Sequence, residues 1–179
     1  MEPWFIATQK FGPLKGASWT NYISWSGLTQ LEEVVSLDPM LCETVLPEIK
    51  PDYWSHIVNE DFMLNFFTDL EFLLKEAAAI PEKNLLCVYR NPPKDPAAND
   101  LLISFEFLGY DLVDIMSSAS ALTNCGGFPH AFRNAELTRK GLLATRKRAF
   151  EVQEALKRLY PQEPHSDCHV WAIFRALGL

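Results

Sequence analysis

Two short segments hold most of the side chains in this chain that are suited to nucleophilic or metal-binding chemistry. One is residues 123–130, with the sequence TNCGGFPH, and the other is residues 165–169, with the sequence HSDCH. Together they contain three of the four histidines and two of the four cysteines. A reactive or metal-binding site, if the protein has one, is therefore expected here.

A zinc site is the first chemistry to consider, because zinc takes Cys and His ligands in tetrahedral sets that usually occur as close sequence pairs. Cys125 with His130 could supply one pair and His165 with Cys168 another, with His169 as an alternate ligand. The spacing matches no known zinc signature, and nothing requires the two pairs to meet. We therefore predict neither a metal nor another cofactor.

A thiol-dependent hydrolase or transferase is the second chemistry. In that hypothesis Cys125 is the nucleophile, His130 or His165 the base, Asp114 or Asp167 the orienting acid, and the Gly126 and Gly127 amides the oxyanion hole. The same Asn-Cys-Gly-Gly run is also typical of a tight turn. No spacing directs a histidine ring toward the sulfur, so we expect Cys125 to be a turn or packing residue.

Three carboxylates, Glu106, Asp111 and Asp114, form a further candidate for acid–base work or divalent-cation binding. Asp111 and Asp114, three residues apart, would share a face only in a helix. Gly109 indicates a bulge or bend, and because Asp111 follows Gly109 and Tyr110, capping of a turn is the simpler expectation for Asp111.

Charge is unevenly spread along the chain. Residues 28–82 contain twelve acidic and two basic residues, a balance of −10, whereas residues 133–158 contain eight basic and three acidic residues, a balance of +5. An acidic surface attracts a basic protein and disfavours nucleic acid. The candidate binding residues are Glu32, Glu33, Glu43, Tyr53 and Trp54. The alternative is that the two charged regions neutralise each other within the fold.

The basic run at residues 139–148 allows the same two interpretations. Arg146, Lys147 and Arg148 open a helix, where the dipole disfavours positive charge. A phosphate or carboxylate could dock there. We prefer the alternative that Glu or Asp side chains of the acidic half, residues 28–82, neutralise these three residues.

Length and composition predict a single domain over residues 1–179 with a sizeable core. No apolar stretch is long enough for a membrane span, and residues 1–4 do not resemble a signal peptide. With no export signal, we expect a cytoplasmic protein with reduced thiols and no membrane partner.

Hydrophobic periodicity predicts the order of elements. Helices are expected over residues 28–37, 59–79 and 145–159, and strands over residues 84–90, 101–108 and 168–175, with an edge strand at 22–25. Residues 91–100 contain three prolines and should form an exposed loop. The order lacks regular βαβ alternation, so we predict an α+β fold with a mainly antiparallel sheet covered by helices on one face.

These observations favour a non-enzymatic, cytoplasmic binding protein whose acidic, aromatic-bearing first half engages a basic partner. An antidote or immunity-type protein that masks a basic toxin has such a charge profile, which is an analogy of charge alone. The thiol enzyme centred on Cys125 and the zinc-binding protein remain the alternatives.

Overall fold

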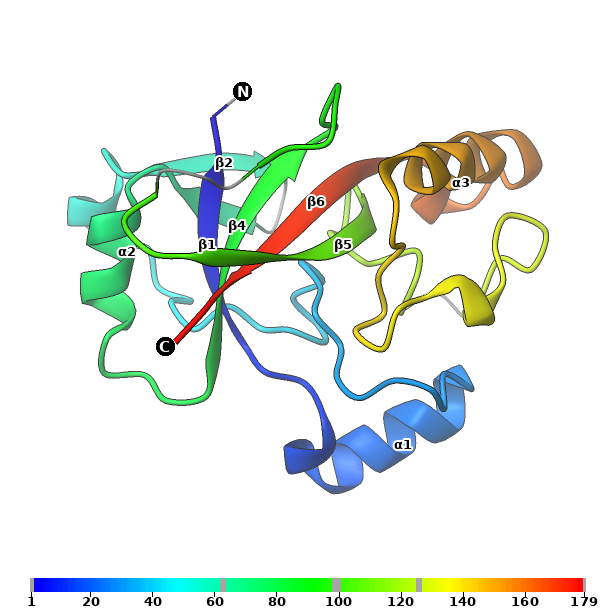
Figure 1. Cartoon of the computed structure of the whole chain (residues 1–179), viewed down its shortest axis with the longest axis horizontal. Coiled ribbons are helices and arrows are strands. Elements are labelled where there is room, and N and C mark those ends of the chain that lie inside the picture. The colour runs from blue at the N-terminus through cyan, green and yellow to red at the C-terminus, as the bar shows by residue number, and fades with distance from the viewer. Residues whose placement is uncertain (1, 62–63, 98–100, 125–126, 179) are drawn as a thin grey trace.

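The chain folds around one six-stranded antiparallel sheet with the strand order β2-β3-β1-β4-β6-β5. The computed structural model describes residues 2–61, 64–97, 101–124 and 127–178 (Figure 1). The strands are β1 (Trp4–Gln9), β2 (Ile57–Asp61), β3 (Leu64–Phe67), β4 (Lys83–Arg90), β5 (Phe105–Asp114) and β6 (Cys168–Ala176). The helices are α1 (Ala17–Ser26), α2 (Leu70–Ala77) and α3 (Arg146–Leu159). The predicted α+β class is confirmed.

Each face of the sheet has its own apolar core, because side chains alternate between the two faces along a strand. On one face, Cys87 of β4 and Ala172 of β6 belong to a cluster to which all three helices contribute. On the other face, Val88 and Ile173 pack with irregular segments that contain Val35 and Leu142. The helices therefore gather on one face, as predicted, and irregular chain covers the other.

Three predicted elements of regular structure are confirmed, namely α3, β4 and β6. Helix α3 begins after Thr145, whose hydroxyl accepts a hydrogen bond from the Arg148 amide. Strands β4 and β6 have nearly the expected bounds. Strand β5 is displaced, because it begins at Phe105 and continues to Asp114, past the bulge expected at Gly109.

The predicted helix over residues 59–79 is wrong. The chain forms β2 and β3 there, and only α2 is helical. Helical spacing of apolar residues misled the prediction, because Leu64 and Phe66 also alternate with Asn65 in the two-residue period of a strand. The helix begins only after Asp69, because the Asp69 side chain is its N-cap and accepts a hydrogen bond from the Phe72 amide.

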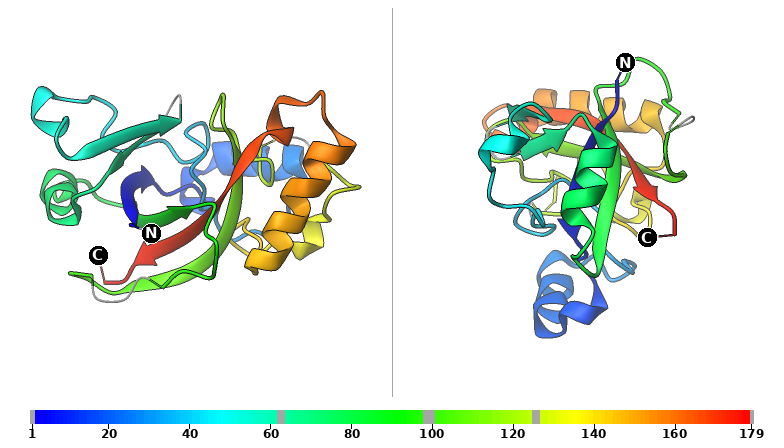
Figure 2. Two further views of the ribbon diagram at one scale, coloured as in Figure 1. Left: turned by 90° about the horizontal axis from the view of Figure 1, so that it is seen from above. Right: turned by 90° about the vertical axis from the view of Figure 1, so that its left-hand side faces the viewer.

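Two further elements of the first half are also wrong. Residues 28–37 form turns and extended chain instead of a helix, and Val34 and Val35 donate backbone hydrogen bonds to Phe11 and Lys140. Residues 22–25 belong to α1 and not to an edge strand. Helix α1 projects away from the sheet (Figures 1 and 2). For that reason its sequence has little hydrophobic periodicity from which a helix could be predicted.

The loop after β4 is irregular over residues 91–97, and residues 98–100 lie outside the described residues. Among the described residues, no helix has the length and apolar character needed to cross a bilayer.

Candidate functional site

Three of the predicted acidic binding residues converge on one groove. Residues 43–45 form backbone hydrogen bonds with β1, which brings Glu43 to the groove. Residues 32–34 form backbone hydrogen bonds with residues 11 and 139, which brings Glu32 and Glu33 to the same place. The groove has a volume of about 760 Å³. Its lining carries four glutamates and two lysines, over an apolar floor that includes Phe11, Val45 and three prolines.

The glutamates of this groove differ in how far they are already neutralised. Glu33 is largely buried and contacts Lys140 at 2.7 Å and Arg175 at 2.6 Å. Burial acts to raise the pKa of Glu33, but these two cations outweigh it and hold the pKa below its ordinary value. Glu32 pairs with Arg139 on the surface. The interpretation that the two charged regions attract each other is therefore correct for Glu32 and Glu33.

Glu43 and Glu82 are exposed at the groove, as Glu32 is, but neither of them forms an ion pair among the described residues. Glu43 accepts one hydrogen bond at 3.2 Å from Gln9, which is a neutral donor. Leu14 lies at the same groove and is 84% exposed, on the single turn η1 (Pro13–Lys15). Exposed acid beside exposed apolar surface is the combination found where a protein surface binds a partner.

Tyr53 and Trp54 lie apart from the lining of this groove. Tyr53 is only 2% exposed, and its hydroxyl donates to Glu76 at 2.7 Å while its ring packs on Phe67 and Phe72. The structure therefore places Tyr53 in the core. Trp54 is 71% exposed beside it.

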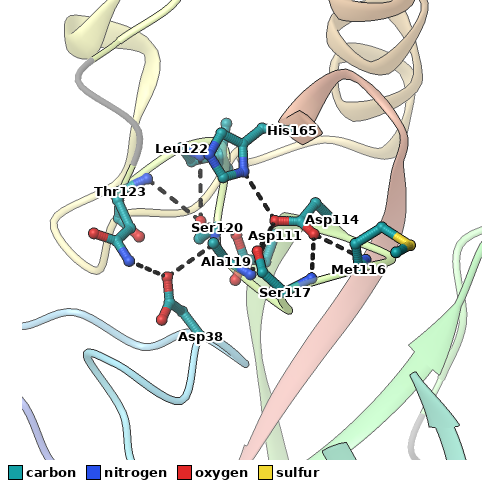
Figure 3. A network of polar contacts seen from close by, with 11 residues as sticks. Asp38, Asp111, Asp114, Met116, Ser117, Ala119, Ser120, Leu122, Thr123 and His165 are labelled. Carbon is teal, nitrogen blue, oxygen red and sulfur yellow. Dashed lines mark hydrogen bonds and ion pairs between the residues drawn. The ribbon is translucent and has the colours of Figure 1, made fainter. Parts of the chain in front are cut away.

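The other candidate segments meet at a buried polar network near the end of β5 (Figure 3). Asp114 accepts hydrogen bonds from the amides of Met116, Ser117 and Ala119, which closes a tight turn after the strand. Turn capping was the expectation for Asp111, which instead lies within β5, so that prediction is wrong and Asp114 is the carboxylate that caps a turn. Asp114 also contacts Nδ1 of His165 at 2.9 Å.

Asp38 and Asp111 form the deeper part of the network, and both are fully buried. Asp111 accepts hydrogen bonds from the hydroxyls of Ser36 at 2.5 Å and Ser120 at 2.7 Å. Asp38 accepts from the Ser120 amide and from the Asn124 side chain. Burial raises the pKa of Asp111 to about 6, against the lowering effect of the two hydroxyls. The network joins residues 36–40 and 117–124 to β5.

The His165 side chain is 24% exposed, so this part of the network reaches solvent. Burial acts to raise the pKa of Asp114, but donors from Ser117 and His165 hold it below its ordinary value. The contact with an ionised Asp114 requires a proton on Nδ1 of His165. This is the orienting pair that the thiol-enzyme hypothesis requires, while its nucleophile, Cys125, lies outside the described residues.

The remaining Cys and His residues are dispersed. His130 is exposed and lines a shallow cleft along α3, and its amide donates to the Tyr160 hydroxyl. Cys168 is buried, which raises the pKa of its thiol to about 12. Nδ1 of His169 contacts the side-chain amide of Asn91. In the described part of the chain, no three or more His, Cys, Asp or Glu residues are arranged to hold a metal ion.

Sequence reasoning missed the groove residues supplied by the turns, above all Leu14 and Glu82. The sequence did contain a signal for Leu14, because it lies between Gly12-Pro13 and Gly16. Glycine and proline mark a turn, and a leucine in such a turn is exposed. No family model matches the chain, and neither does any curated protein or solved structure.

Proposed function

We propose that this protein is a non-enzymatic binding module whose acidic groove takes a basic segment of a partner protein. The observation that carries the proposal is the groove at which Glu43 and Glu82 are exposed without an ion pair among the described residues, beside apolar lining residues such as Phe11 and Leu14. Lysine and arginine suit such a groove, because their aliphatic stems pack on apolar surface while their charged ends reach carboxylates.

Glu43 and Glu82 are the carboxylates that would contact the partner directly. Glu32 and Glu33 already have cationic partners, so their contribution to binding is smaller. Leu14 and Phe11 would supply the apolar contacts that set the dissociation rate, because long-range charge mainly accelerates association. An antidote-type role, in which the groove masks a basic toxin, is the biological setting that this arrangement fits by analogy of charge.

A reducing compartment such as the cytoplasm belongs to the same proposal. Cys42, Cys87 and Cys168 are free buried thiols, which is the usual state in that compartment.

The test is affinity capture of a partner, followed by binding measurements with the purified pair. The double variant Glu43→Lys/Glu82→Lys should weaken binding by at least about tenfold and slow association, with a smaller dependence on salt. The double variant Glu154→Lys/Glu163→Lys makes the same charge change at exposed positions that do not line the groove, so it should bind like the native protein. A partner that binds the double variant and the native protein equally would exclude the groove.

The thiol-dependent enzyme is the second candidate, because the Asp114–His165 pair favours it. An activated cysteine requires a depressed pKa and solvent access. The discriminating measurement is the pH dependence of Cys125 alkylation by iodoacetamide in the folded protein. A midpoint of the alkylation rate at pH ~8.5 supports the binding module. A midpoint below ~7 that is lost in His165→Ala supports the enzyme.

A further inference from the structure

Strand β5 is an edge of the sheet, and only part of its outer side is covered. Over its second half the chain returns to cover it: Tyr110 and Leu143 exchange backbone hydrogen bonds at 2.8 and 2.9 Å, and Ala121 donates to Leu112. Over its first half, residues 105–108, the backbone pairing among the described residues is with β6 alone. Figure 2 shows β5 along the rim of the sheet.

Gly109 explains why the covered part begins where it does. A Cβ at this position would lie 2.8 Å from both the Leu142 Cβ and the Leu143 carbonyl oxygen, and its φ is +145°. Glycine therefore allows residues 142–143 to cross close to the strand. The bulge between Phe107 and Gly109 marks the same point. The open edge ends there and is about four residues long.

The residues of the open edge are suited to strand pairing. Phe107 is 41% exposed, Glu106 is exposed, and Phe105 is half-buried. Protein edges are commonly protected by lysine, proline or an inward-pointing charge. Residues 105–108 contain neither lysine nor proline, although they include the charged Glu106. Among the described residues, the main-chain groups of Phe105 and Phe107 form no backbone hydrogen bond outside the pairing of β5 with β6.

A cleft of about 430 Å³ lies beside this edge and gives it side-chain selectivity. Its exposed apolar wall is Phe107, whose ring packs 5.3 Å between centroids from the buried ring of Tyr110. Asp95 also lines the cleft, and its carboxylate accepts a hydrogen bond from the Tyr110 hydroxyl at 2.6 Å. Arg146 and Lys147, at the start of α3, form its basic end. The Lys147 side chain is 88% exposed and stands 3.9 Å from the Glu151 carboxylate, so it can also reach an acidic group on a ligand.

A second copy of this chain is a poor occupant of the edge. The Ser104 carbonyl bonds to Leu177 on the β6 side, so by alternation Phe105 and Phe107 direct their backbone groups outward. If both residues paired with a symmetric copy, the two Glu106 side chains would lie directly opposite each other. Directly opposed like charges destabilise a strand pair.

We propose that the open edge of β5 binds an extended segment of a different protein, which adds to the sheet as a seventh strand. The segment carries an apolar side chain that enters the cleft against Phe107. It also carries an acidic side chain that contacts Lys147. This surface is separate from the acidic groove and has the opposite charge preference, so it stands independently of the proposed function.

The experiment is selection of binders from a displayed library of random eight-residue peptides on the whole protein. Enriched peptides should alternate β-forming residues and include Asp or Glu. N-methylation of alternate peptide amides should reduce affinity at least about tenfold, because it removes main-chain donors and keeps every side chain. The amides of Phe105 and Phe107 should gain protection from hydrogen exchange when peptide binds.

Protein variants locate the site. Phe107→Lys and Lys147→Glu should each weaken peptide binding at least about tenfold, whereas Lys157→Glu, the same charge change at an exposed position of α3 outside the cleft lining, should not. The proposal is overturned if selection yields no binders, or if the binders tolerate N-methylation or Phe107→Lys. Dimerisation of the protein alone that Phe107→Lys abolishes would also overturn it, in favour of a second copy.

Discussion

Asp111 is expected to make this protein more stable in mild acid than at neutral pH. Its carboxyl group is fully buried, and burial raises its pKa from 3.8 to about 6 in the folded state. When the folded pKa is above the unfolded one, stability is fully present below the unfolded pKa and is lost as pH rises through the folded pKa. The loss for this group is complete above about pH 6 to 7.

The size of the effect follows from the displacement of the pKa. A shift of about two pKa units corresponds to about 3 kcal/mol in total. Because part of it is already lost at pH 4.5, Asp111 by itself should make the free energy of unfolding about 2 kcal/mol larger at pH 4.5 than at pH 7. That is a large part of the ~5–15 kcal/mol stability of a typical domain.

Urea denaturation at pH 4.5 and pH 7 measures this difference, with Asp111→Asn as the comparison. The amide has nearly the same shape but does not ionise, so the variant should lose the Asp111 part of the pH dependence. Glu33 and Asp114 have lowered pKa values, so they stabilise the fold at higher pH and lose that contribution in acid. Both are present in native protein and variant, so the difference between the two isolates Asp111. Equal pH dependence in the two proteins would refute the reasoning.

Three further outcomes are expected. Truncation of the buried Phe67 in Phe67→Ala should reduce the free energy of unfolding by about 3–5 kcal/mol; a loss below about 1 kcal/mol would mean that its packing on Tyr53 and Phe72 contributes little. Gly109→Ala should cost at least about 2 kcal/mol, because its Cβ would overlap Leu142 and the Leu143 carbonyl, whereas Gly27→Ala, which meets open space, should cost only about 1 kcal/mol. Cys42, Cys87 and Cys168, whose thiol pKa values burial raises to about 12, should resist alkylation in native protein and react after denaturation; labelling of any of the three in native protein at neutral pH would contradict their burial.

The sequence alone determined the elements whose signals are local and agree with one another. Helix α3 has an N-cap at Thr145 and one apolar stripe, and β4 and β6 are short runs rich in β-forming residues, so their spacing and their termini pointed to the same structure. The apolar residues of 28–37 are buried, although the chain there is not helical.

Only the tertiary structure decided what depends on contacts between residues far apart in the chain. Residues 34–35 are extended because their amides bond to Phe11 and Lys140, which no local pattern records. The groove exists because residues 9–15, 32–33, 43–47 and 80–82 meet at one end of the sheet. Folding also pairs Glu33 with Lys140 and leaves Glu43 exposed. The charge of a surface therefore depends on which charged residues the fold brings together, and the sequence does not give these contacts.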